Sequence, residues 1–259
     1  MRIPIFQVDA FAPRAFSGNP AAVCLLDDWL DDATLQAIAA ENNLSETAFL
    51  VVVDSGVAIR WFTPACEVNL CGHATLAAGA VMLAEAGPDA GEIVFDSPAG
   101  PLKVSRSDTD YTVELPARPA RPVPVPDGLE QALDTAVSGC LLADYRMALV
   151  GSESVVRKLA PDLDWIAAQP ELGLIVTAAG DDADFVSRFF APGGGVPEDP
   201  VTGSAHCTLV PYWADRLGKD TLLARQLSPR GGELACENRP DTVRLTGGVR
   251  PYLRGEITI

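Results

Sequence analysis

Two short stretches of the sequence place small, polar and acid–base residues in the same order. Residues 67–76 read EVNLCGHATL, and residues 198–209 read EDPVTGSAHCTL. In each stretch a glutamate stands five residues before a glycine, and a polar residue and an alanine follow the glycine. The two glycines, Gly72 and Gly203, are separated by about half of the 259-residue chain, which favours two similar halves that present two similar loops.

An apolar run follows each stretch, so both are predicted to be loops that lead into helices, at residues 73–86 and 204–217. Glycine at the start of a helix lets backbone N–H groups approach a ligand closely, and the helix dipole favours negative charge there. If both helix starts point into one cleft, they could bind a carboxylate or an enolate. The alternative is that both are plain helix caps of a duplicated domain.

Proton transfer beside a bound carboxylate needs an acid and a base held away from bulk water. The candidates are Glu46, Cys71, His73 and Asp199. His73 at a helix start is expected to be neutral, and Glu46 in a dry cleft would have a raised pKa and could shuttle a proton. The alternative for Glu46 is a solvated loop residue. For His206 we expect a structural role, because three residues into its helix it turns toward the packing face.

The remaining pattern predicts an α+β fold of two pseudo-symmetric domains. Each is expected to be a rolled, mostly antiparallel, barrel-like β-sheet around a central apolar helix. Five prolines in residues 116–126 predict a stiff interdomain linker. The expected domains are residues 1–117 and 118–249, and a final strand in residues 250–259 could complete the first domain.

Composition narrows the class of function. The net charge of −16, from 19 Lys and Arg against 35 Asp and Glu, leaves little material for a nucleic-acid-binding face. The sequence shows neither a signal peptide nor an apolar run long enough for a membrane helix, so the expected location is cytoplasmic. Six cysteines without Cys-x-x-Cys spacing and only two histidines argue against structural disulfides and structural zinc.

Four motifs resemble the phenazine-biosynthesis isomerase (PhzF-like) family. They are Phe16-x-Gly18-Asn19-Pro20, Leu44-Ser45-Glu46-Thr47, Cys71-Gly72-His73-Ala74-Thr75 and Glu198-Asp199-Pro200-x-Thr202-Gly203-Ser204-Ala205. They fall in order and span the chain. This family has the diaminopimelate epimerase-like fold, with the active site between two similar domains, and its type member isomerises a dihydro-hydroxyanthranilate by a proton shift.

The resemblance implies a role for each matched position. Glu46 would be the general acid and base that moves the proton. The other implied site residues would orient the substrate or support the transfer, with backbone at the two glycines receiving its carboxylate; they are Asn19, Ser45, Cys71, Gly72, His73, Asp199, Thr202, Gly203 and Ser204. The resemblance implies neither a metal nor an organic cofactor, and it implies a homodimer.

One departure bears on mechanism. Related two-base epimerases place a cysteine before the glycine in both loops, whereas this chain has Cys71 in the first and Thr202 in the second. A thiol–thiol racemase is therefore disfavoured. The sequence predicts a cofactor-independent isomerase acting on a small carboxylate-bearing substrate. The alternatives are an amino-acid epimerase or dehydratase that uses Cys71 with Thr202 or Glu46, and a catalytically silent metabolite-binding protein.

Overall fold

Two units, each with its own buried helix, divide the chain in the computed structural model, which describes residues 1–54 and 56–259. The first unit comprises Met1–Leu115 and Thr246–Ile259, and the second comprises Pro116–Leu245. No helix within the described residues combines the length and the apolar character that a membrane span requires.

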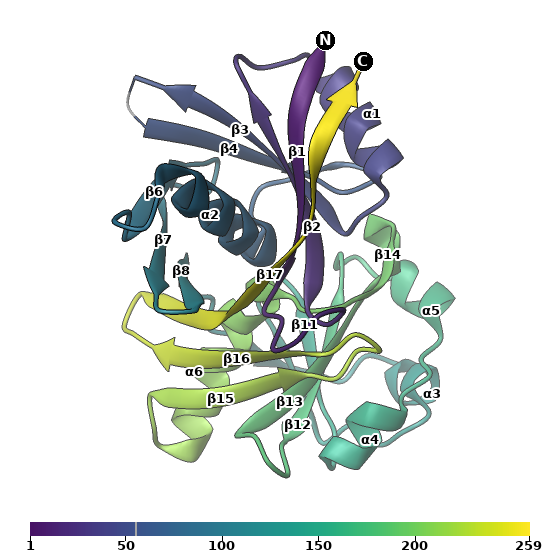
Figure 1. The fold of residues 1–259 in the computed structure, drawn as a ribbon. Coiled ribbons are helices and arrows are strands. Elements are labelled where there is room, and N and C mark those ends of the chain that lie inside the picture. Colours follow the sequence, from purple (N-terminus) through teal and green to yellow (C-terminus); the bar gives the residue numbers. More distant parts are fainter. Residues whose placement is uncertain (55) are drawn as a thin grey trace. The chain divides into compact units, whose positions relative to one another are not determined.

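The first unit is a strongly bent sheet around one helix, α2 (Gly72–Ala86) (Figure 1). Antiparallel pairs join β1 to β2, β3 to β4, β6 to β7 and β7 to β8, while β2 runs parallel to β3, and β4 to β6. The strand bounds are β1 (Arg2–Ala10), β2 (Asn19–Leu26), β3 (Glu46–Val53), β4 (Gly56–Phe62), β5 (Glu67–Val68), β6 (Glu92–Asp96), β7 (Leu102–Ser107) and β8 (Asp110–Pro116). The last strand, β17 (Thr242–Thr258), pairs antiparallel with β1 through its C-terminal part.

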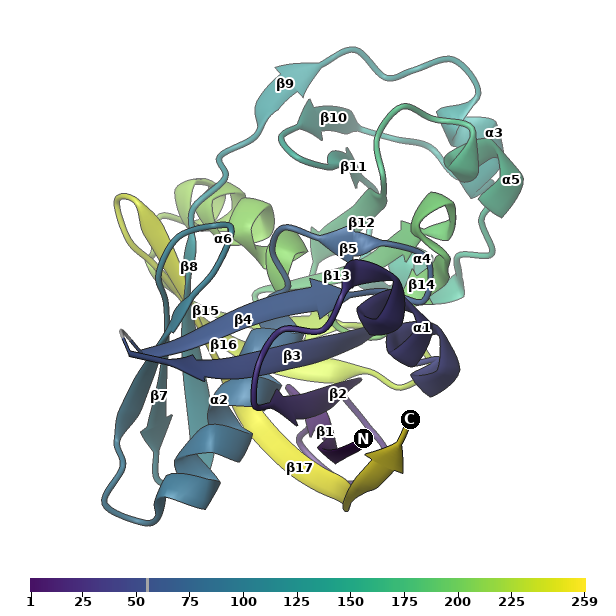
Figure 2. The ribbon, with the colours of Figure 1, turned by 90° about the horizontal axis from the view of Figure 1, so that it is seen from above.

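The helix α2 is the core of this unit. Eleven of its 15 residues are buried, because its sequence is apolar on every face and strands β1, β2, β3, β6 and β7 pack around it. A Cβ atom at Gly79 would lie 2.4 Å from Cγ1 of Val104 in β7, so this close approach requires glycine. The second helix, α1 (Asp32–Asn42), packs beside β3, where Phe49 joins its buried residues (Figure 2).

The second unit repeats the connections of the first. In each unit an antiparallel pair of strands is followed by a short strand and then by a 15-residue helix. The strand after the helix runs parallel to the second strand of that pair. The second helix of this kind is α6 (Gly203–Leu217), which packs against β15 and β16. The other bounds are β9 (Arg121–Val123), α3 (Leu129–Leu133), β10 (Gly139–Leu142), β11 (Arg146–Leu149), α4 (Glu153–Lys158), α5 (Leu163–Ala167), β12 (Leu174–Ala179), β13 (Phe185–Ala191), η1 (Pro192–Gly194), β14 (Val196–Asp199), β15 (Thr221–Gln226) and β16 (Gly232–Asn238).

The predicted α+β class and the two buried central helices are confirmed, and the structure adds detail that the sequence pattern did not show. The proline-rich segment contains β9, which pairs with β10. Pro122 fits in this short strand because proline, which has no N–H, is accepted where the strand needs no hydrogen-bond donor. The final strand expected in residues 250–259 is the C-terminal part of a longer strand, β17, which begins at Thr242. Helix α3 ends at Leu133, because Asp134 adopts a left-handed conformation with φ of 48°.

Candidate active site

The start of α2 lies beside the first residues of two neighbouring strands. Cys71 precedes the helix in an extended conformation, and its carbonyl oxygen accepts hydrogen bonds from the backbone N–H and the hydroxyl of Thr75. Glu46 is the first residue of β3 and pairs with Ala21 of β2, two residues after Asn19. The parallel register of these strands therefore brings Asn19 and Glu46 to one end of the sheet, close to the helix start.

Three predicted site residues meet at the His73 ring. The Nε2 atom of His73 lies 3.3 Å from Oε2 of Glu46, although the ring N–H and the carboxylate are not aligned as in an ideal hydrogen bond. The other ring nitrogen, Nδ1, lies 3.0 Å from Nδ2 of Asn19 and 3.5 Å from Sγ of Cys71. The structure thus brings three predicted residues, Glu46, Asn19 and Cys71, close to the imidazole of a fourth, His73.

Burial decides the charge of this ring. The His73 side chain is 3% exposed and that of Glu46 is 15% exposed. Loss of hydration lowers the pKa of His73 to about 3, so the ring is neutral at physiological pH. The neutral imidazole expected from the sequence is therefore found, with burial as its cause. The contact with Glu46 is that of a neutral ring with an acidic side chain, rather than an ion pair.

Glu46, Cys71 and His73 also form a group of metal-ligand types within 4.8 Å of one another. The thiol approaches Nδ1 of the ring and the carboxylate approaches Nε2. A metal ion binds one ring nitrogen at a time, so the imidazole separates the two other donors instead of directing all three to one ion. The arrangement places a polar neighbour beside each ring nitrogen rather than a ligand set shared by one ion.

The start of α6 is held by a closed hydrogen-bond network. Thr202 precedes the helix, and its hydroxyl donates to Oδ2 of Asp199 at 2.5 Å. The Gln226 amide, at the end of β15, accepts from the backbone N–H of Thr202 at 2.8 Å and donates to the carbonyl of Asp199 at 2.7 Å. All three residues are buried, so the loop before α6 is fixed by β15.

Two further side chains complete this second helix start. His206 is fully buried, its Nδ1 lies 2.8 Å from the Thr202 carbonyl oxygen, and its ring packs against Phe185. Burial lowers the pKa of His206 to about 4. These contacts support the structural role expected for His206. Ser204 lies with its hydroxyl 3.2 Å from that of Tyr145.

Gln226 and Tyr145 were not predicted as site residues. Gln226 lies in β15, a strand that the sequence pattern did not indicate, so no signal in the sequence pointed to its contacts with Asp199 and Thr202. Nothing near Tyr145 in the sequence indicated a contact with Ser204. Of the other predicted residues, Ser45 directly precedes β3 and is half-buried, while Gly72 and Gly203 are buried first residues of their helices.

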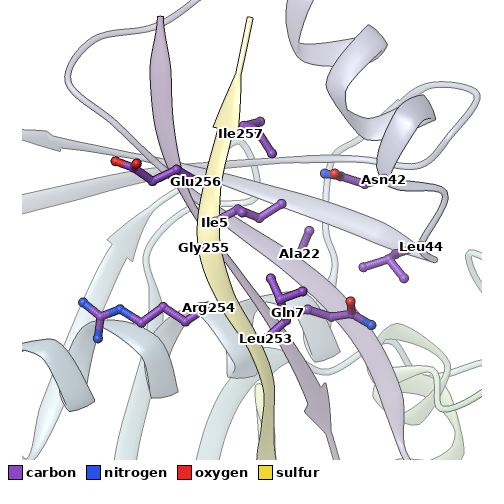
Figure 3. A pocket seen from close by; sticks show the side chains of 10 residues that line it. All are labelled: Ile5, Gln7, Ala22, Asn42, Leu44, Leu253, Arg254, Gly255, Glu256 and Ile257. Atoms are coloured by element: carbon purple, nitrogen blue, oxygen red, sulfur yellow. The ribbon is translucent and has the colours of Figure 1, made fainter.

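A separate pocket of about 390 Å³ lies elsewhere in the first unit (Figure 3). Leu253 and Ile257 of β17 point toward Asn42 and Leu44, and Arg254 and Glu256 point away from them. Among the described residues, those lining this pocket include none of the predicted site residues. The pocket is therefore distinct from the residues gathered around His73.

Comparison with known proteins places these features in a family. The family model described as "Phenazine biosynthesis-like protein" matches residues 8–137 and 143–250. The chain is 48% identical over 99% of both chains to an uncharacterized isomerase of Pseudomonas aeruginosa. It is 43% identical, with a TM-score of 0.94 over the whole of both chains, to the crystal structure of a PhzF-family phenazine biosynthesis protein of Enterococcus faecalis.

A more distant solved structure, described as a predicted epimerase, has the same fold. The structure of a predicted epimerase from Pseudomonas aeruginosa, 22% identical, has a TM-score of 0.76 over 99% of both chains. The epimerase-like fold predicted from the sequence is thereby confirmed. The prediction of an isomerase agrees with the names of the closer relatives, and the chain belongs to the phenazine biosynthesis-like protein family.

Proposed function

We propose that this protein is a cofactor-independent isomerase that shifts a proton on a small carboxylate-bearing substrate, with Glu46 as the general acid and base. The observation that carries the proposal is the contact between Glu46 Oε2 and Nε2 of the buried, neutral His73 at the start of α2. A partly exposed carboxylate beside a neutral ring can accept a proton from a bound molecule and return it.

The proposed reaction balances without a further reagent. Glu46 removes a proton from a carbon next to an unsaturated system, and the electrons of the broken C–H bond move into that system. The carboxylic acid so formed returns the proton to a different carbon, which regenerates the carboxylate. Substrate and product have the same formula, and the enzyme ends each turnover in its starting state.

The helix starts supply the proposed anion contacts. Backbone N–H groups at Gly72, together with Ser45, would receive the substrate carboxylate beside Glu46, because the start of α2 favours negative charge. The start of α6, with Gly203 and Ser204, is an equivalent anion-binding element of the second unit. Asp199 and Thr202 support that loop through their mutual hydrogen bond.

The test is a ligand screen followed by a reaction in heavy water. Hydroxyanthranilate-like acids and amino acids are first screened by their effect on thermal unfolding. Compounds that bind are then incubated with the enzyme in D₂O and followed by proton NMR. The proposal expects an isomer of the compound that carries its hydrogen or deuterium at a new carbon.

Other outcomes would favour the alternatives. Exchange at the α-carbon of an amino acid, with racemisation, would favour an epimerase that uses Cys71. Loss of water from the compound would favour a dehydratase. Binding without any change in the bound compound, over the whole panel, would favour a metabolite-binding protein.

A further inference from the structure

The Asn19 side chain determines which nitrogen of His73 carries hydrogen. Its amide nitrogen, which can only donate, lies 3.0 Å from Nδ1 of the ring. Nδ1 must therefore accept, and a neutral imidazole has a single ring hydrogen, which then resides on Nε2. That nitrogen is the one that lies 3.3 Å from Glu46 Oε2. The amide thus leaves an N–H, and not a lone pair, on the ring nitrogen that lies nearest the proposed acid–base group.

An Asn19 amide turned the other way would require a different protonation state of Glu46. If the amide oxygen of Asn19 faced the ring, Nδ1 would carry the hydrogen and the lone pair of Nε2 would face Glu46. A lone pair beside a carboxylate is repulsive, so that arrangement requires Glu46 to be protonated. The observed orientation matches the ionised carboxylate that can act as a base.

The backbone around Asn19 fixes the amide in place. Asn19 is fully buried and begins β2, where it pairs with Ala10 of β1. The preceding Gly18 has φ of 73°, and a Cβ atom there would lie 2.3 Å from the Ala10 carbonyl oxygen. Only glycine fits this turn, so the turn and the strand pairing together set the position of the amide.

We propose that Asn19 is a positioning residue that holds His73 as its Nε2–H tautomer and so places an N–H, and not a lone pair, beside Glu46. The catalytic consequence rests on the proposed function: the ring N–H, 3.3 Å from Oε2, favours the ionised carboxylate that accepts the proton from the substrate. The tautomer itself does not depend on any reaction.

The second histidine provides an internal contrast. Nδ1 of His206 lies 2.8 Å from a carbonyl oxygen, which can only accept, so His206 carries its hydrogen on Nδ1. The chain contains two histidines in all. The structure therefore assigns opposite tautomers to the only two imidazoles, and each can be read separately in one spectrum.

The experiment is two-bond proton–nitrogen NMR on the full chain labelled with ¹⁵N-histidine, recorded near pH 8. A His206→Gln variant assigns the signals. The wild type should show an Nε2–H pattern for His73 and an Nδ1–H pattern for His206. An Nδ1–H pattern for His73 would overturn the proposal, and this reading needs no Asn19 variant to fold.

Replacement of the amide tests its role directly. In Asn19→Asp the ionised side chain can only accept, so hydrogen should appear on Nδ1 of His73 while the His206 pattern stays unchanged. The matched control is Asn42→Asp, where the amide instead donates to Oγ1 of Thr47 at 3.0 Å and the His73 tautomer should not move. An unprotonated Nδ1 in Asn19→Asp would contradict the positioning role.

Kinetics separate this proposal from the proposed function. Asn19→Asp should lower kcat more than about tenfold with a smaller change in KM. The reason is that the substitution changes the hydrogen on the His73 ring beside Glu46, and not the groups that bind the substrate. A shifted tautomer with unchanged kcat would refute the catalytic consequence. Full activity of Glu46→Gln would refute the proposed function alone and leave the tautomer assignment standing.

Discussion

The starts of α2 and α6 occupy equivalent places in two repeated units, yet their polar groups are organised differently. At α2 the ring of His73 faces the carboxylate of Glu46, which keeps part of its surface exposed. At α6 the side chains of Asp199, Thr202 and Gln226 satisfy one another in a buried network. One start therefore places a carboxylate and an imidazole side by side at a helix end, and the other fixes a loop.

The position of the histidine along each helix accounts for part of this difference. His73 is the second residue of α2, and His206 is the fourth residue of α6. At 3.6 residues per turn, a shift of two positions rotates a side chain by about 200° around the helix. The imidazole that meets a carboxylate in one unit is thus turned into the core in the other. A repeated scaffold does not imply a repeated chemical role.

The two histidines provide the largest expected contrast. We expect His73→Asn to lower turnover by about 100-fold or more, since it removes the ring that contacts Glu46. His206→Asn should retain the turnover of each folded molecule and lose stability instead, because it disturbs a fully buried packing site. Steady-state kinetics and denaturant unfolding of both variants measure the contrast. Equal losses of turnover in the two variants would remove the distinction between the helix starts.

Removal of Gln226 should show how firmly the second helix start is fixed. Gln226→Leu leaves the Thr202 N–H and the Asp199 carbonyl without their partner, at about 1–3 kcal/mol for each buried group. The expected loss in the free energy of unfolding is about 3 kcal/mol. Gln169→Leu is the control, because its partly buried amide makes one bond to a helix carbonyl and should cost less than about 1 kcal/mol. Similar losses in both variants would contradict the network's importance.

The buried histidines also predict a pH dependence of stability. Their pKa values in the folded chain, about 3 for His73 and about 4 for His206, lie below the ordinary value of 6.5. Below about pH 6.5 the unfolded chain therefore binds protons that the folded chain does not, and stability falls with pH. Each histidine should contribute a loss of about 2 kcal/mol at pH 5.

Urea unfolding from pH 7 to pH 5 measures this effect against a matched variant. The loss in the free energy of unfolding between pH 7 and pH 5 should be smaller in His206→Gln, because one of the two buried histidines is gone. The contributions of the carboxylates are the same in both proteins. An identical pH dependence in wild type and variant would show that His206 is protonated in the folded state.

The smallest effects are expected for the residues before the two glycines. Cys71→Ala should retain turnover within about tenfold, because Glu46 and not a thiol is the proposed proton carrier. Thr202→Cys restores the two-cysteine pattern but breaks a hydroxyl bond to Asp199, and it should not create racemase activity. Loss of all turnover in Cys71→Ala, or amino-acid racemisation by Thr202→Cys, would favour a thiol mechanism.

The sequence was informative where local pattern dominates. Helix α2 is apolar on every face, and both central helices begin at a glycine that follows a polar loop. Such signals are read directly from residue types. Asp31 before α1 is a further local signal, because aspartate is a preferred residue at a helix start and its carboxylate accepts a hydrogen bond from the Thr34 N–H. Glu46 and His73 were named as acid–base candidates from their residue types, and the resemblance to a family then assigned their roles, although 27 positions separate them.

What could not be predicted depends on contacts distant in sequence. The pairing of Asn19 with the His73 ring requires the β2 position, the tight turn at Gly18 and the α2 start to be known together. The Gln226 bonds to the loop before α6 arise from a strand that sequence pattern did not reveal. Polar networks of this kind depend on tertiary geometry, and periodicity carries little information about them.

Glu46 is the proposed carrier of the proton, and the Glu46→Gln variant tests this role. The substitution keeps the size of the side chain and removes its ability to accept a proton, with Glu67→Gln as a control because that carboxylate binds Arg60. We predict that Glu46→Gln loses about 1,000-fold or more in turnover while it keeps its fold and its binding of the carboxylate ligand, and that Glu67→Gln stays near wild type. Full turnover by a well-folded Glu46→Gln protein would contradict the account.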